Sequence, residues 1–147
     1  MRNHQNQVRS KLGGCLSVAV WVGFLLTPAT RAADVDVSKL PAPAAKQGVT
    51  YEKDIKPILE KSCVKCHSGD RPKSKYRMES LEGVIKGGSS EEAAIIAGKS
   101  DKSPLVWYVS DAVEEMEMPP LDNRDKYEPL TTEQVSLIRA WIDQGAK

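Results

Sequence analysis

The chain is poor in several residue types that many functional sites require. Its 147 residues include one Phe, two His and three Cys, and the formal net charge is only +1. The longest apolar stretch, over 12–26, is shorter than the about 20 residues of a comfortable membrane span. A nearly neutral chain lacks the basic face typical of nucleic-acid binding. Any metal or cofactor site must therefore be built from very few His and Cys ligands.

The N-terminal segment has the layout of a secretory signal peptide. Basic residues precede the apolar stretch 12–26, and the small residues Thr30 and Ala32 stand at the −3 and −1 positions of a cleavage site after Ala32. We therefore predict that 1–32 is removed and that the protein is exported, to the periplasm or its equivalent. The alternative is an uncleaved segment that tethers the protein to the membrane.

Removal of this segment changes the charge of the protein. All four basic residues of 1–32 are lost with no acidic residue, which leaves 17 basic and 20 acidic side chains and a net charge of −3. A mildly acidic surface suits a basic or neutral redox partner protein, and we expect such a partner rather than nucleic acid.

Two segments follow the predicted cleavage site. Residues 33–48 are rich in Ala and Pro and are interpreted as a flexible or extended linker. The alternative is a packed N-terminal arm. The domain itself is predicted to cover 49–147.

Helical periodicity is the main structural signal in the domain. Ile55, Leu59 and Cys63 fall on one helix face, and Pro57 is tolerated if it lies in the first turn. Shorter helices are predicted over 80–86, where Gly87 follows, and from Ser103 as N-cap.

The last helix has the clearest boundaries. Thr131 and Gln134 form a capping-box pattern, and Gly145 is predicted as the left-handed residue after the helix end. No segment alternates with the period of a strand. The predicted fold class is therefore all-α, with about four to five short helices.

Cys63-Val64-Lys65-Cys66-His67 is the chemically most informative motif. Cys-x-x-Cys-His is the attachment signature of a c-type haem. Two thiols three positions apart reach the two vinyl groups on one edge of a porphyrin, and His67 follows as an axial ligand of the iron. The sequence therefore predicts one covalently bound haem c, enclosed by the all-α domain.

Three other uses of this motif compete with haem attachment. A structural zinc site usually needs four ligands from separated pairs, and a thioredoxin-like pair needs a βαβ context. The third alternative is a disulfide between Cys63 and Cys66. If the motif carries no haem, the third functional hypothesis is a non-haem binding module.

The residues alone leave several candidates for the sixth iron ligand. His4 leaves with the predicted signal peptide, so bis-histidine ligation within the chain is excluded. Met78, Met116, Met118 and a Lys amine remain as candidates. Met118 is favoured because Pro119-Pro120 makes a stiff strap behind it. Met78 is expected to pack near the haem instead.

The remaining aromatic and acidic residues have broader interpretations. Trp107, Tyr108 and Trp141 are expected in the core or the haem wall. The acidic residues around Glu114, Glu115 and Glu117 form a solvated face or a docking patch beside the ligand loop.

The chain from about residue 50 onward resembles the planctomycete-type cytochrome c domain, within the class I cytochrome c-like superfamily. The resemblance rests on the haem-attachment motif and on Tyr76-Arg77-Met78-Glu79-Ser80, Ser103-Pro104-Leu105, Met118-Pro119-Pro120 and Trp141-Ile142-Asp143-Gln144-Gly145. It implies a class I cytochrome c-like fold, with His67 and Met118 as axial ligands and the first and last helices crossing beside the haem. Arg77-Met78 and Ile96-Ala97-Gly98 depart from the family's usual pattern, but neither segment supplies a ligand.

The first functional hypothesis is a mono-haem one-electron carrier outside the cytoplasm, and not an enzyme. A Met/His pair raises the reduction potential and suits an electron carrier. The alternative is a haem sensor or peroxidase-like protein with a labile sixth ligand.

Overall fold

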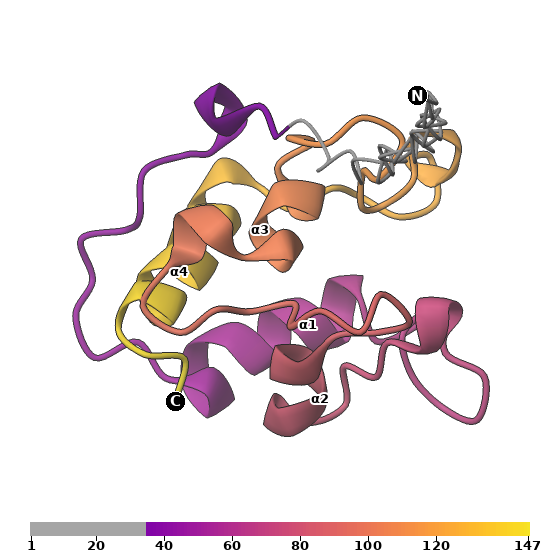
Figure 1. The fold of residues 1–147 in the computed structure, drawn as a ribbon, viewed down its shortest axis with the longest axis horizontal. Coiled ribbons are helices and arrows are strands. Elements are labelled where there is room, and N and C mark those ends of the chain that lie inside the picture. Colours follow the sequence, from indigo (N-terminus) through magenta and orange to yellow (C-terminus); the bar gives the residue numbers. More distant parts are fainter. Residues whose placement is uncertain (1–34) are drawn as a thin grey trace, which may run out of the picture. The chain divides into compact units, whose positions relative to one another are not determined.

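The computed structural model describes residues 35–147, so the predicted signal peptide lies outside the described residues. The described part contains helices and turns but no strand, which confirms the all-α prediction. Its α-helices are α1 (Lys56–Ser62), α2 (Leu81–Lys86), α3 (Pro104–Val109) and α4 (Thr132–Asp143) (Figure 1). None of the helices described here is long and apolar enough to cross a membrane.

The first helix is preceded by a wider helical turn. Tyr51–Ile55 form a π-helical turn that runs directly into α1. Pro57 lies in the first turn of α1, as predicted, where its missing N–H leaves no hydrogen bond unmade. Ile55 and Leu59 are fully buried, so the predicted apolar face of this helix points into the core.

The ends of the later helices are set mainly by local side chains. The Ser80 hydroxyl accepts a hydrogen bond from the Gly83 N–H at the start of α2, and Gly87 ends that helix at φ 89°. Thr131 and Gln134 form the predicted capping box of α4, and Gly145 follows its end at φ 101°. The sequence signals predicted three of these four ends, and the predicted start of α2 at 80 lies one residue before the observed start.

The start of α3 differs in detail from the prediction. Ser103 is its N-cap residue, but the Ser103 side chain makes no capping bond. The hydroxyl instead donates to the Lys99 carbonyl and accepts from the Ile96 N–H, both at 2.9 Å. Ser103 is completely buried, and these bonds satisfy its hydroxyl within the preceding loop.

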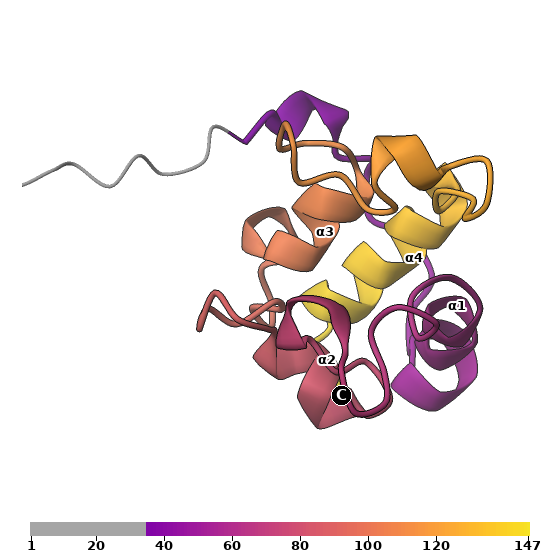
Figure 2. The same cartoon turned by 90° about the vertical axis from the view of Figure 1, so that its right-hand side faces the viewer.

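The core is built around α4. Trp141 is 0% exposed, and its ring lies 5.9 Å from that of Tyr51, in the turn before α1. The Trp141 Nε1–H donates to the carbonyl of Lys147 at 3.0 Å, so this large side chain is buried with its polar atom satisfied. Figure 2 shows α4 between α3 and α1, and α4 contacts both α3 and the turn Tyr51–Ile55.

The described part of the predicted linker is hydrogen-bonded to the domain at several points. Ala44 donates its N–H to the Ser136 carbonyl at 2.9 Å, and the carbonyl of Pro41 accepts from Arg139. Gln144 binds the Lys46 carbonyl at 2.9 Å. Residues 35–48 are therefore a bound, mostly extended arm rather than a flexible tether, because side chains of α4 and its C-cap bind two of the arm's backbone carbonyls.

Candidate functional site

The Cys63–His67 motif continues the end of α1 as a series of tight turns. The Cys63 N–H donates to the Leu59 carbonyl at 2.8 Å, and the His67 N–H donates to the Cys63 carbonyl at 3.0 Å. Cys63 packs against the core cluster, and both cysteines are free thiols. The chain direction set by α1 thus places two thiols and one imidazole within a few residues.

The thiol of Cys63 lies in an apolar environment. Burial, with a smaller contribution from Cys66, raises the pKa of Cys63 to about 12. The thiol form is therefore stable near neutral pH, since a buried thiolate is poorly solvated. A redox-active pair would need the opposite, a cysteine whose pKa is lowered, which argues against the thioredoxin-like alternative.

The imidazole of His67 is held in one orientation. Its Nδ1 lies 3.2 Å from the carbonyl oxygen of Lys73, which can only accept a hydrogen bond. Nδ1 therefore carries the proton in this contact, and Nε2 keeps its lone pair for another partner. Burial lowers the pKa of His67, against the opposing effect of its backbone contacts, so the neutral form is favoured. A neutral, oriented imidazole is the form that binds a metal.

Tyr76 supports this imidazole from the side. The two rings meet edge to face with centroids 5.5 Å apart, and the Tyr76 hydroxyl donates to the Val84 carbonyl at 2.7 Å. Met78 follows and is 2% exposed, with its N–H bonded to the His67 carbonyl at 2.8 Å. The segment after the polar loop thus returns to form a wall beside His67.

Met118 approaches the same region from a different part of the chain. Its N–H donates to the Tyr108 carbonyl at the end of α3, at 2.9 Å. The Met118 side chain is partly buried and packs against the core cluster. Met116, two residues earlier, is 43% exposed.

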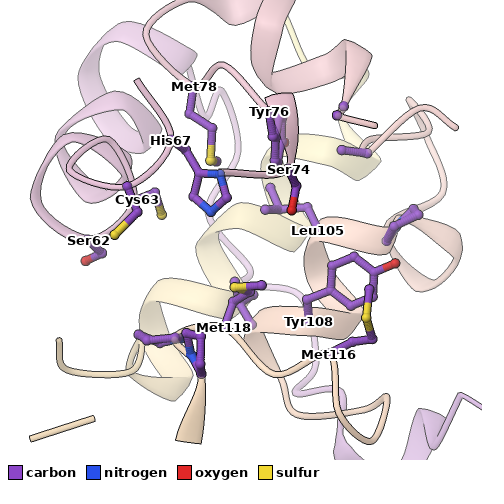
Figure 3. A pocket seen from close by; sticks show the side chains of 18 of the residues that line it. Ser62, Cys63, His67, Ser74, Tyr76, Met78, Leu105, Tyr108, Met116 and Met118 are labelled. Atoms are coloured by element: carbon purple, nitrogen blue, oxygen red, sulfur yellow. The ribbon is translucent and has the colours of Figure 1, made fainter. Parts of the chain in front are cut away.

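A single open pocket brings these groups together. Figure 3 shows His67 and Met118 on opposite sides of it, with Cys63 beside them. The space amounts to about 1150 Å³ when its solvent-open part is included. The lining is mainly apolar and also includes Cys66, Tyr76, Met78, Leu105, Tyr108, Val109, Met116, Pro119, Tyr127 and Leu130.

The pocket lining contains two of the residues that the sequence predicted near the haem. Met78 lies in the pocket wall, as does Tyr108, whereas Trp141 belongs to the core. Trp107 donates its Nε1–H to the Asp101 carbonyl at 2.7 Å and is absent from both sets. Tyr127 and Leu130 were not singled out as pocket residues from the sequence. They follow the Pro pair in an irregular segment whose path no local pattern reveals.

The chemistry of the donors fits a covalent haem. An apolar pocket with a few convergent donor groups is the usual form of a cofactor site. Here the donors are two free thiols beside a neutral imidazole, with a thioether on the opposite wall. Among residues 35–147, no three His, Cys, Asp or Glu side chains gather as a metal cluster. An all-helical domain with this donor set has the features of a c-type cytochrome.

Residues 63–122 match the family model described as Planctomycete cytochrome C. This match supports a planctomycete-type cytochrome c domain over that part of the chain, and it suggests a haem-binding role in electron transfer. The matched segment contains the haem-attachment motif and the Met118 strap but neither α1 nor α4. A search of curated proteins and a search of solved structures each found no match to this chain.

Proposed function

We propose that this protein is a mono-haem c-type cytochrome that carries one electron at a time outside the cytoplasm. Cys63 and Cys66 would hold the haem through thioether bonds, and His67 and Met118 would be the two axial ligands of the iron. The observation that supports this most strongly is the shared pocket, in which His67 and Met118 face each other beside the Cys63 thiol. The sequence has one Cys-x-x-Cys-His motif, which supports a single haem.

The bound haem iron would supply reversible one-electron chemistry, and the protein would set its ligands and surroundings. The Lys73 carbonyl fixes the proton of His67 on Nδ1, which directs Nε2 away from that contact and makes it a better donor. The thioether of Met118 would be a weak, soft ligand that favours the reduced state and raises the potential. The mainly apolar lining would give the bound haem an apolar environment.

The helix packing supports a class I cytochrome c-like arrangement. The turn leading into α1 meets α4 through the Tyr51 and Trp141 rings, with centroids 5.9 Å apart. We propose that these two elements are the first and last helices that cross beside the haem in this superfamily. Both elements flank the core from which Cys63 leads into the pocket.

The proposed setting outside the cytoplasm rests on the predicted signal peptide over 1–32 and on the family, whose domains are typically exported. Redox partner proteins would exchange electrons at the pocket opening. The exposed residues Glu114 and Glu115 precede the Met118 strap, and we propose that they form part of a docking surface.

The experiment that separates a carrier from a protein with a labile sixth ligand compares Met118→Ala with Met116→Ala. We expect the wild-type ferric protein to show the absorption band of thioether ligation and a reversible one-electron titration. Met118→Ala should lose that band and lower the potential, while Met116→Ala should change neither. A wild-type protein without the band, unchanged by Met118→Ala, would contradict the carrier proposal and favour a sensor or peroxidase-like function.

A further inference from the structure

The Met118-Pro119-Pro120 strap has little regular structure around it to hold Met118 in place. Between the end of α3 at Val109 and the start of α4 at Thr132, the only helical element is a single 3₁₀ turn at Leu121–Asn123. The Met118 N–H bond to Tyr108 fixes one point of the strap. A thioether binds iron weakly, so its position must be fixed by other contacts if the ligand is to stay in place.

Arg124 supplies a second and stronger attachment. Its two terminal nitrogens bind the two carboxylate oxygens of Asp111, at 2.9 and 2.5 Å. Its Nε–H donates to the carbonyl of Pro119, the residue directly after Met118, at 3.1 Å. The planar guanidinium thus binds a carboxylate in two-point geometry and a strap carbonyl at the same time, which a Lys ammonium could not reproduce.

The anchor at Asp111 is itself fixed from two sides. The Asp111 carbonyl accepts a hydrogen bond from Lys39 Nζ at 2.7 Å. The next residue, Ala112, donates its N–H to the Trp107 carbonyl at 2.9 Å and accepts from the Asp36 N–H at 2.8 Å. The strap is therefore bound to a turn that α3 and the N-terminal arm both hold.

The side chains of this attachment are partly shielded from solvent. Arg124 is 24% and Asp111 36% exposed at the side chain. A pair with two-point geometry and partial burial is held more firmly than a typical surface pair. By contrast, the pair of Arg77 and Glu79 on the His67 side is a single contact of 3.6 Å between more exposed side chains.

We infer that Arg124 is a positioning residue for the sixth ligand: it holds the Met118 side chain toward the pocket and thereby selects Met118 over the nearby Met116. This inference rests on the proposed ligation of a haem iron by Met118. It adds a role for a residue that lies outside the pocket lining and supplies no ligand.

The test uses Arg124→Gln in the exported protein with its haem, and Arg77→Gln as a control with the same charge change. We expect Arg124→Gln to weaken the thioether band and lower the potential. Carbon monoxide, which competes with the thioether for ferrous iron, should bind about fivefold faster, equivalent to ~1 kcal/mol. Arg77→Gln should leave all three unchanged.

Two further variants separate positioning from general damage. Asp111→Asn removes the charge of the partner, and Asn tolerates the left-handed φ of 55° found there, so it should reproduce most of the Arg124→Gln effect. Arg124→Lys keeps the charge without the two-point geometry and should give an intermediate effect. If Arg124→Gln does not fold, these two variants decide the question.

Hydrogen exchange gives a readout independent of redox behaviour. The amide N–H of Met118 should exchange faster in Arg124→Gln, while the amide N–H of His67 should not change. The inference would be overturned if Arg124→Gln, or the two substitute variants, kept wild-type values of three quantities. These are the thioether band, the rate of carbon monoxide binding and the exchange rate of the Met118 amide. A wild-type protein without a thioether band would instead contradict the proposed Met118 ligation, and the inference with it.

Discussion

The two sides of the pocket are built in different ways. On the His67 side, the Cys63 N–H binds Leu59, the His67 N–H binds Cys63 and the Met78 N–H binds His67, so all three bonds lie within one continuous segment. On the Met118 side, the strap depends on Tyr108, on Arg124 and on a turn that the N-terminal arm also binds, 72 residues away in the sequence. One segment therefore builds the first wall, whereas the second also depends on a contact with a distant part of the chain.

The largest effect should come from removing the ligand on the locally determined side. We expect His67→Ala to abolish the low-spin spectrum and nearly all stable holoprotein, because no other histidine exists within 35–147. Met118→Ala should keep the covalent haem, since neither thiol is touched. Haem content per chain and the visible spectrum, measured on both variants, check this difference.

The comparison would fail if the two variants lost haem equally. It would also fail if His67→Ala kept a low-spin spectrum, which would show that another side chain replaces the imidazole without loss. Either outcome would mean that the His67 wall is no more important for holding the haem than the Met118 wall.

A smaller effect is expected at Tyr76, where the His67 wall meets α2. Burial raises the pKa of Tyr76, so its hydroxyl stays protonated and donates to the Val84 carbonyl. Tyr76→Phe leaves that carbonyl without this donor and should lower the free energy of unfolding by about 1–2 kcal/mol. The spectrum should not change, because the ring that packs on His67 remains.

Denaturant unfolding of Tyr76→Phe and Tyr127→Phe measures this contribution. The Tyr127 hydroxyl makes no hydrogen bond with the described residues, so its loss should cost less than about 0.5 kcal/mol. Equal losses in the two variants would show that the Tyr76 hydrogen bond contributes nothing specific.

The smallest effect concerns the N-terminal arm, which is bound at two ends. Lys46 pairs with Asp54 in the turn before α1, and Lys39 binds the carbonyl of Asp111. Near α1, hydrogen bonds from Lys46 and then Thr50 lower the pKa of Asp54. A carboxyl with a lowered folded pKa contributes stability that is present above its unfolded pKa and is lost as the pH falls through the folded pKa. The other end of the arm binds the backbone carbonyl of Asp111, which does not titrate.

Acid should therefore release the Lys46 end of the arm before the Lys39 end. The hydrogen-exchange protection factor of the Thr50 amide, which donates to Asp54 at 2.8 Å, should fall as the pH drops below the ordinary Asp range in the wild-type protein. Asp54→Asn should remove this acid-dependent step. If both ends of the arm lost their hydrogen-exchange protection at the same pH, the predicted difference between the two ends would be contradicted.

Much of the fold could be predicted because its signals are local. The capping box of Thr131 and Gln134 and the glycines after α2 and α4 act through neighbouring backbone groups. The docked arm was only the alternative prediction, since Ala and Pro favour a linker and the contacts that bind the arm come from α4 and its C-cap, about 100 residues later. Composition says little about a segment whose partners lie elsewhere in the sequence.

The site shows the same division. Cys63, Cys66 and His67 are contiguous and could be identified from spacing alone. The sequence favoured Met118 through its Pro pair and the family resemblance, but it could not exclude Met116. The position of Arg124 could not have been predicted, because no spacing pattern relates it to Asp111, thirteen residues earlier in an irregular segment.

The most direct test of the central claim is the intact mass of the exported protein, followed by peptide mapping. We predict the mass of residues 33–147 plus one haem, carried by the peptide that contains Cys63 and Cys66. If 1–32 were retained with the haem in place, only the predicted cleavage would be wrong. A chain mass with two unmodified thiols, or with a disulfide between them, would contradict the account of this pocket as a haem site.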